Sequence, residues 1–156
     1  MYSTAATGLP LNALLNEKKL KLLYLDIGLL KRAGHLDVDI LLEPDFLAIN
    51  QGQLAEQFVG QELLAYQDIL TPPETYFWAR DKRGASAEVD YVINVGSQVV
   101  PIEVKSGRSN SMKSLRIFMA EKNSFIGLKV STDRLHQVEN IMNFPFYMVS
   151  EISRLV

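Results

Sequence analysis

Two β-type segments joined by a short turn constrain this chain more than any other feature. They cover residues 87–93 and 99–105, are rich in Val and Ile, and alternate apolar with polar side chains. The residues between them include Gly96, which suits a tight reversal of the chain. We therefore predict that the two segments form an antiparallel hairpin.

Charged residues interrupt both segments of the predicted hairpin. Asp90 lies in the first segment, and Glu103 and Lys105 lie in the second. Residues two apart in a strand point to the same face, so Glu103 and Lys105 are expected side by side. Two carboxylates and an amine on one face suit a hard divalent cation and a phosphate. The alternative is a solvent-facing charge ladder in which Asp90 forms an ion pair with Lys105.

A helix is predicted upstream of the hairpin, over residues 54–64. Apolar residues recur there at intervals of three and four, as on the buried face of a helix. Glu56 stands at the edge of this apolar stripe. It is either a member of the acidic site or an ordinary solvent-exposed carboxylate.

These residues together resemble the PD-(D/E)XK nuclease superfamily, which has the restriction-endonuclease-like fold. That superfamily places one Asp on a strand, Glu-x-Lys on the next strand, and often a Glu on a preceding helix. Asp90 matches the Asp, and Glu103-Val104-Lys105 matches Glu-x-Lys. Glu56 matches the helical Glu, four residues after Gly52. The Pro of the motif name is missing, because Val89 precedes Asp90.

The resemblance implies a metal-dependent catalytic site. Its catalytic residues would be Asp90, Glu103, Lys105 and Glu56. Asp90, Glu103, the carbonyl of Val104 and Glu56 would hold Mg²⁺ or Mn²⁺. Lys105 would orient the attacking water or stabilise developing charge.

A longer resemblance, to the DUF4143 family, covers most of the chain. Residues 21–30 resemble its K-x-x-F-x-D-x-G-L start, and residues 52–63 match its G-x-x-x-E-x-x-V-x-x-E-L helix. Phe77-Trp78-Ala79-Arg80 matches an aromatic-Trp-Arg strand. This unit usually follows an AAA-type ATPase domain, which implies an ATPase partner and a chain that is a fragment or a remnant. The sequence contains no Gly-x-x-x-x-Gly-Lys-Ser/Thr motif, so no P-loop is expected.

Length and composition limit the remaining classes. A chain of 156 residues favours one domain, which we place at residues 21–156 after an N-terminal lead-in of residues 1–20. A net charge of −2 argues against a strongly basic nucleic-acid binder. Zero Cys and two His exclude disulfides, thiolate metal sites and a histidine-built zinc site. No membrane-length apolar run or secretory signal is visible, so the expected compartment is the cytoplasm.

The other expected elements are less constrained. Residues 1–10 read as irregular, and the basic run Lys18, Lys19 and Lys21 as a solvated face. Asp26 is expected to cap a helix. The remaining expectations are a break at Pro44, a strand over 76–80 with Trp78 in the core, a charged turn over 81–84, a helix over 112–122 capped by Asn110 or Ser111, a strand over 125–130, a helix or turn over 135–142, and a last strand over 146–149.

The expected fold class is therefore α/β, with a mixed sheet flanked by helices. The function expected first is a metal-dependent nuclease acting on DNA or RNA. The alternatives are a non-catalytic regulatory or binding module that partners an ATPase, and an interaction domain of a toxin–antitoxin or defence system. The complete Asp…Glu-x-Lys set favours the nuclease. The net negative charge and the missing ATPase domain favour the non-catalytic module.

Overall fold

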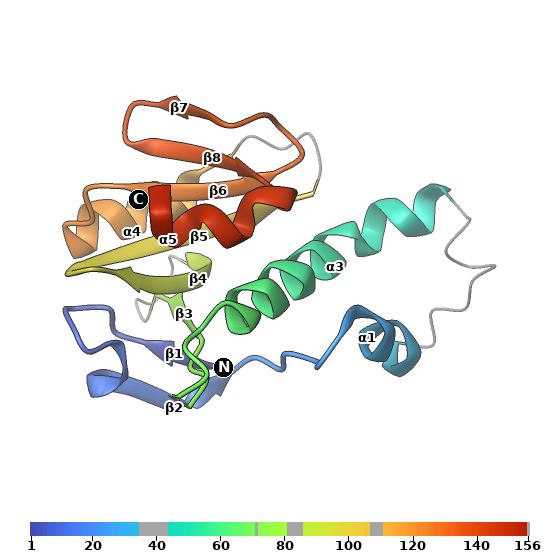
Figure 1. Ribbon diagram of the computed structural model, residues 1–156, viewed down its shortest axis with the longest axis horizontal. Helices are drawn as coiled ribbons and strands as arrows, with labels where there is room; N and C mark the ends of the chain where they lie inside the picture. The colour runs from blue at the N-terminus through green and yellow to red at the C-terminus, as the bar shows by residue number, and fades with distance from the viewer. Residues whose placement is uncertain (35–43, 71, 81–85, 107–110, 156) are drawn as a thin grey trace.

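The computed structural model describes residues 1–34, 44–70, 72–80, 86–106 and 111–155 (Figure 1). These residues build one mixed sheet in the order β2-β1-β3-β4-β5-β6-β8-β7. The expected mixed α/β class is confirmed. The strands are β1 Tyr2–Thr4, β2 Leu15–Leu20, β3 Tyr76–Ala79, β4 Glu88–Val95, β5 Gln98–Lys105, β6 Gly127–Ser131, β7 His136–Val138 and β8 Ile141–Pro145.

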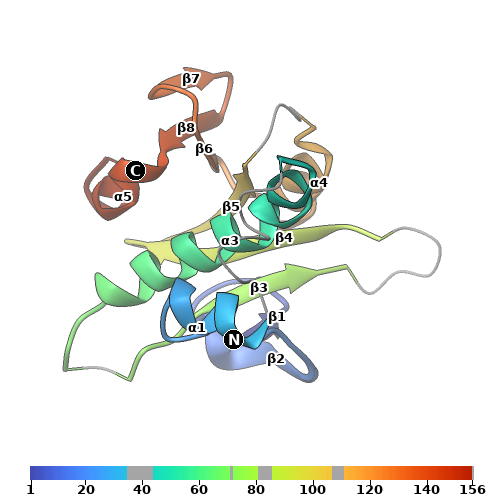
Figure 2. The same cartoon turned by 90° about the vertical axis from the view of Figure 1, so that its right-hand side faces the viewer.

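Helices cover both faces of the sheet. They are α1 Ile27–Ala33, α3 Pro44–Ala65, α4 Lys113–Lys122 and α5 Ile152–Leu155, with two 3-10 helices, η1 Leu11–Leu14 and η2 Phe146–Glu151. Figure 1 shows η2 and α5 in front of the sheet and α4 behind it. The beginning of α3 and all of α1 extend beyond the sheet (Figures 1 and 2). No helix in the described ranges has the length and apolar character needed to cross a membrane.

The central hairpin is confirmed. Strands β4 and β5 pair antiparallel from Tyr91↔Ile102 to Val95↔Gln98. They are longer than predicted, so the turn shrinks to Gly96 and Ser97. Gly96 has a φ of 58°, a conformation that glycine adopts without the steric cost of a Cβ. Strand β5 then pairs in parallel with β6, after the crossover through α4.

Two apolar clusters hold the layers together. On the α4 side, Trp78 packs edge-to-face on Phe118, with ring centroids 5.3 Å apart. Both residues are buried, so the predicted core role of Trp78 is confirmed. On the other side, Val59 of α3 joins Ile102 and Phe144 of the sheet. Apolar clusters thus cover both faces of the central sheet.

The N-terminal expectation of irregular structure is wrong. Strand β1 pairs in parallel with β3 and antiparallel with β2. The small polar residues Ser3 and Thr4 of β1 are buried, and the Thr4 hydroxyl donates to the carbonyl of Leu11 at 2.7 Å. Backbone pairing and this buried hydrogen bond hold the short segment as a strand, and Tyr2 and Thr4 are residue types that favour strands.

Two C-terminal expectations are also wrong. Residues 135–142, predicted as a helix or turn, contain β7 and the start of β8, which pair from Val138↔Ile141 to His136↔Asn143. Glu139, at the reversal, has a φ of 55°. Residues 146–149, predicted as a strand, lie in η2. The last strand is instead β8, which ends at Pro145, and the chain continues as the 3-10 helix η2.

Several helix boundaries differ from those predicted. Pro44, expected to break a helix, is instead the first residue of α3, where its missing N–H costs nothing. Helix α4 begins after Met112, without a side-chain cap, so the predicted Ser111 cap is not formed. The Asp26 cap is confirmed, since its Oδ1 accepts a hydrogen bond from Leu29 N at 2.8 Å. Asn110 and the charged turn over 81–84 lie outside the described residues.

Candidate functional site

The candidate site lies where β4 and β5 separate. Their backbone pairing stops at Tyr91↔Ile102, so Asp90 is the first β4 residue beyond the ladder. Its side chain replaces the missing backbone contact, because Asp90 Oδ2 accepts a hydrogen bond from Val104 N at 2.8 Å. The local fold therefore orients this carboxylate across the opening.

Glu103 and Lys105 meet at this opening, as predicted from their spacing. Lys105 Nζ lies 2.7 Å from Glu103 Oε1. Glu103 is buried, and its second oxygen, Oε2, has no hydrogen-bond partner within the described ranges. The predicted alternative of an Asp90–Lys105 ion pair is not what the structure shows, since Lys105 bonds Glu103 and Asp90 bonds the backbone.

Glu56 faces the same region from α3. Its Oε2 lies 4.0 Å from the ammonium of Lys21, which also forms an ion pair with Glu88 of β4. Lys21 Nζ lies 5.1 Å from the ring centroid of Phe77, a cation–π arrangement. Glu56 therefore does not point away from the sheet into open solvent.

Burial and mutual repulsion raise the pKa values of the acidic groups. Burial, and then the charge of Asp90, raise the pKa of Glu56 to about 7. The same two causes raise the pKa of Glu103, against the opposing bond from Lys105. Burial also raises the pKa of Asp90, although the Val104 N–H opposes it. These carboxylates are close enough to disfavour one another's charge, which is typical of sites that bind cations or transfer protons.

Lys21 adds a positive charge to this acidic group. Burial alone would lower the pKa of Lys21, but the hydrogen bond to Glu88 and the charges of Asp90 and Glu56 raise it on balance. Lys21 therefore stays an ammonium. The expectation that it belongs to a solvated basic run is wrong, since its side chain is mostly covered.

Helix α3 is held at the site by two buried side chains. The hydroxyl of Tyr91 donates to the carbonyl of Glu56 at 2.7 Å. Gln57 bonds both backbone groups of Tyr24, accepting at 3.0 Å and donating at 2.7 Å. A cavity of about 270 Å³ lies between these contacts and is lined by Lys21, Glu56 and Tyr91, among others.

Lys21 and Glu88 are the members of this cluster that sequence reasoning missed. Both stand in motifs that were visible: Lys21 begins the K-x-x-F-x-D-x-G-L segment, and Glu88 begins Glu-Val-Asp. The sequence did not predict that these two residues lie close together. Their proximity depends on the pairing of β2 with β1, which places Lys21 next to the sheet.

The three predicted acidic ligands do not meet as a closed cage. The parts of the chain that the structure describes contain no group of three or more His, Cys, Asp or Glu residues that could hold a metal ion. The residues at the opening nevertheless fit a partial set of metal ligands. Among the described residues none donates a hydrogen bond to the buried Glu103 Oε2, and the charge of Asp90 on the neighbouring strand acts on this carboxylate. A buried anionic oxygen in that state calls for a compensating charge, for which a bound cation is a standard source.

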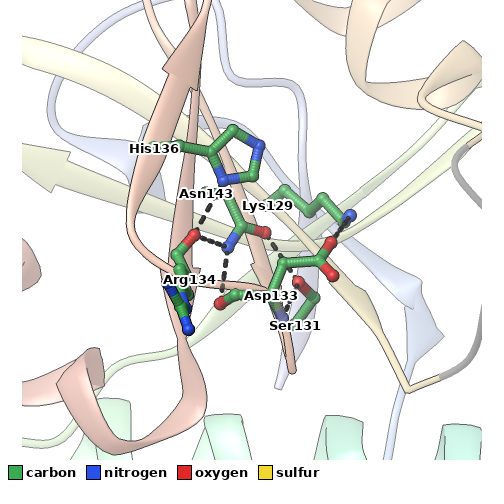
Figure 3. Close-up of polar contacts among 6 residues, drawn as sticks. All are labelled: Lys129, Ser131, Asp133, Arg134, His136 and Asn143. Atoms are coloured by element: carbon green, nitrogen blue, oxygen red, sulfur yellow. Dashed lines mark hydrogen bonds and ion pairs between the residues drawn. The ribbon is translucent and has the colours of Figure 1, made fainter.

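A polar network links the end of β6, the loop that follows it, and β8 (Figure 3). Lys105 of β5 pairs with Ser131 of β6, so the network adjoins the Glu103–Lys105 pair through one strand. Buried Asn143 accepts from the Ser131 hydroxyl at 2.7 Å and donates to the carbonyls of Asp133 and Arg134 at 3.0 and 2.9 Å. Asp133 also forms an ion pair with Lys129 at 2.7 Å. These bonds fix the loop that follows β6.

Asn143→Ala is expected to destabilise the protein by about 1–3 kcal/mol, because it leaves the buried hydroxyl of Ser131 and two carbonyls short of partners. Denaturant unfolding followed by circular dichroism measures this change. Gln137→Ala, on the exposed neighbouring strand β7, is the control and should stay within about 0.5 kcal/mol of the wild type. Equal effects from the two substitutions would show that the Asn143 network is not structural.

Glu56→Gln is expected to stabilise the metal-free protein at pH 8 and to have little effect near pH 5. The folded pKa of about 7 lies above the ordinary value of 4.5, so the folded state favours the protonated carboxyl. The contribution of the Glu56 carboxyl to the free energy of unfolding is fully present below pH 4.5, its ordinary pKa. This contribution is lost as the pH rises through about 7. Thermal unfolding in EDTA at both pH values tests this, with Glu62→Gln on the same helix as control. A wild-type-like profile for Glu56→Gln would contradict the raised pKa of the half-buried Glu56 carboxyl.

The comparisons identify the family. Residues 51–147, more than half of the chain, match the family described as a domain of unknown function, DUF4143. The chain belongs to the DUF4143 family. The matched segment begins inside α3 and runs through the hairpin, α4 and β8, so it contains Glu56, Asp90, Glu103 and Lys105. Lys21 precedes it. A search of curated proteins found no match.

Proposed function

We propose that this DUF4143 domain is a divalent-metal-dependent phosphodiesterase of the PD-(D/E)XK type, with a restriction-endonuclease-like core, that acts on DNA or RNA. The order of its parts supports the proposal. Glu56 lies on α3, which precedes β4 and β5 in the chain, Asp90 lies on β4, and Glu103 and Lys105 lie on the adjacent β5.

The observation that carries the proposal is the state of Glu103. One of its oxygens bonds Lys105, while the other is buried beside Asp90 and accepts no hydrogen bond from the described residues. Leaving such an oxygen unpaired costs about 1–3 kcal/mol or more. A stable protein tolerates this unfavourable free energy where the oxygen binds a ligand. Paired carboxylates at a strand end suit Mg²⁺ or Mn²⁺ as that ligand.

Asp90, Glu103 and the carbonyl of Val104 are the residues that would hold the metal. Because Mg²⁺ keeps several of its waters, this small set of protein ligands is sufficient. When bound, the metal supplies positive charge that polarises the phosphate and makes a water acidic. Glu56, on α3, would add a further carboxylate to this set.

Lys105 and Glu56 have different roles in the proposed reaction. Lys105 Nζ, anchored by Glu103, donates to a phosphate oxygen and stabilises the charge that develops on it. Glu56, with a pKa of about 7, accepts a proton from the attacking water at Oε2. Lys21 holds Glu56 toward the sheet and limits the repulsion among the carboxylates.

A second candidate is a non-catalytic module that partners an AAA-type ATPase. The observation that favours it is the open ligand set, since the described residues contain no three-residue acidic cage. Lys21 already neutralises part of the acidic charge through Glu88. Under this candidate the cluster stabilises the fold, and the ATPase supplies the activity.

Cleavage assays separate the two candidates. Purified protein is incubated with labelled single-stranded, duplex and branched DNA and RNA, in Mg²⁺, in Mn²⁺ and in EDTA. The proposal predicts cleavage in metal and none in EDTA, and Asp90→Ala protein prepared in the same way controls for contaminating nuclease. A folded wild type that cuts nothing, alone or with an AAA-type ATPase partner present, would overturn the nuclease proposal and favour the module.

A further inference from the structure

A larger cavity lies away from the candidate site. Its volume is about 590 Å³, and it is an open pocket lined by the carboxyl end of α3, the last part of β4 and the η2–α5 segment. Its apolar floor includes Leu63, Val92, Val149 and Ile152. None of Glu56, Asp90, Glu103 and Lys105 lines it. The volume is in the range of small-molecule sites, which is about 300–1,000 Å³.

The polar lining of this cavity has one sign of charge. Asp68 and Glu74 contribute carboxylates, and the described lining residues include no Lys, Arg or His. Tyr66 and Tyr76 contribute two aromatic rings. The Tyr66 ring is at the rim, with 61% of the residue exposed, so its face is free to contact a ligand.

Glu74 is fixed in place by neutral groups. Gln67, just after α3, clamps its backbone, donating to the Glu74 carbonyl at 2.7 Å and accepting from the Glu74 N–H at 2.9 Å. The Glu74 carboxylate accepts hydrogen bonds from the hydroxyl of Tyr76 and from Asn12. These donors orient the carboxylate, and within the described ranges no cation pairs with its negative charge.

We propose that this cavity binds a small organic cation, an amine or guanidinium group carried on an apolar body. The carboxylate of Glu74 receives the positive charge, and the exposed ring of Tyr66 attracts it through its π face. The floor of Leu63, Val92, Val149 and Ile152 covers the apolar body. An anionic ligand is disfavoured, because no cation lines the cavity within the described ranges.

Three probes of one shape test the charge preference: benzylamine, benzyl alcohol and benzoate. They are titrated into the full chain, with calorimetry and amide chemical shifts as readouts. Benzylamine should bind and shift the resonances of residues around Glu74, whereas benzyl alcohol and benzoate should bind at least about tenfold more weakly.

Glu74→Gln should weaken benzylamine binding by about tenfold or more, since it removes the charge and keeps the shape. Glu62→Gln removes one carboxylate from the same region without touching the cavity and should leave binding unchanged. Tyr66→Leu, at the exposed rim, provides a second test that does not depend on the Glu74 hydrogen bonds and should also weaken binding. Equal binding of the three probes, no binding of benzylamine at millimolar concentration, or unchanged binding in folded Glu74→Gln would each overturn the proposal.

Discussion

Lys105→Ala is expected to lower the rate of metal-dependent phosphodiester cleavage by about 10²–10³ while leaving Mn²⁺ binding intact. The Lys105 ammonium bonds Glu103 Oε1 and is the positive charge nearest the buried Glu103 oxygen on β5. Removing it deprives the developing charge on the phosphate of its donor. It also frees Glu103 Oε1, so the affinity for a cation should not fall.

Initial rates and Mn²⁺ titrations on the same preparation separate these effects. Lys113→Ala, an exposed lysine at the start of α4, is the matched control and should cleave at the wild-type rate. A parallel loss of metal binding and activity in Lys105→Ala would show that Lys105 only maintains the site. Full activity in that variant would remove Lys105 from the mechanism.

Gly60→Ala is expected to destabilise the protein by about 1–3 kcal/mol through overpacking. A Cβ at position 60 of α3 would collide with the hydroxyl of Tyr91 and lie 2.7 Å from Leu23 Cδ1. The Tyr91 hydroxyl holds the carbonyl of Glu56, so the substitution pushes the helix away from the site. Metal affinity and activity should fall with stability.

Gly52→Ala is the matched control on the same helix. A Cβ at position 52 meets nothing within 4 Å, so this variant should gain up to about 1 kcal/mol from higher helix propensity. Urea unfolding of both variants measures the difference. If Gly60→Ala were as stable as Gly52→Ala, the close approach of α3 to Tyr91 would be refuted.

The parts of the fold that the sequence predicted are those with strong local signals. The alternation in the central hairpin and the glycine at its turn predicted β4 and β5, and the spacing of Glu103 and Lys105 predicted their contact. The helical period around Val59 predicted α3, although not its start at Pro44. In each case the signal lay within one segment.

The features that were missed depend on contacts between distant segments. Strand β1 contains small polar residues and becomes a strand through its pairing with β3. Lys21 joins the acidic cluster only because β2 pairs with β1. Residues 135–149 carry apolar residues whose spacing fits several structures, and the reversal at Glu139 decides among them. Neither the cavity at Glu74 nor the opening of the ladder at Asp90 has a local sequence signal.

Calorimetric titration of Mn²⁺ into the wild type and into Glu103→Gln tests the central claim most directly. Gln keeps the size of the side chain but removes the charge of the buried carboxylate, whose Oε2 accepts no hydrogen bond from the described residues. Our account predicts measurable binding to the wild type, unchanged binding to the control Glu17→Gln, and binding at least about tenfold weaker to Glu103→Gln. A wild type that binds no Mn²⁺ at millimolar concentration, or a folded Glu103→Gln that binds it equally well, would contradict the account.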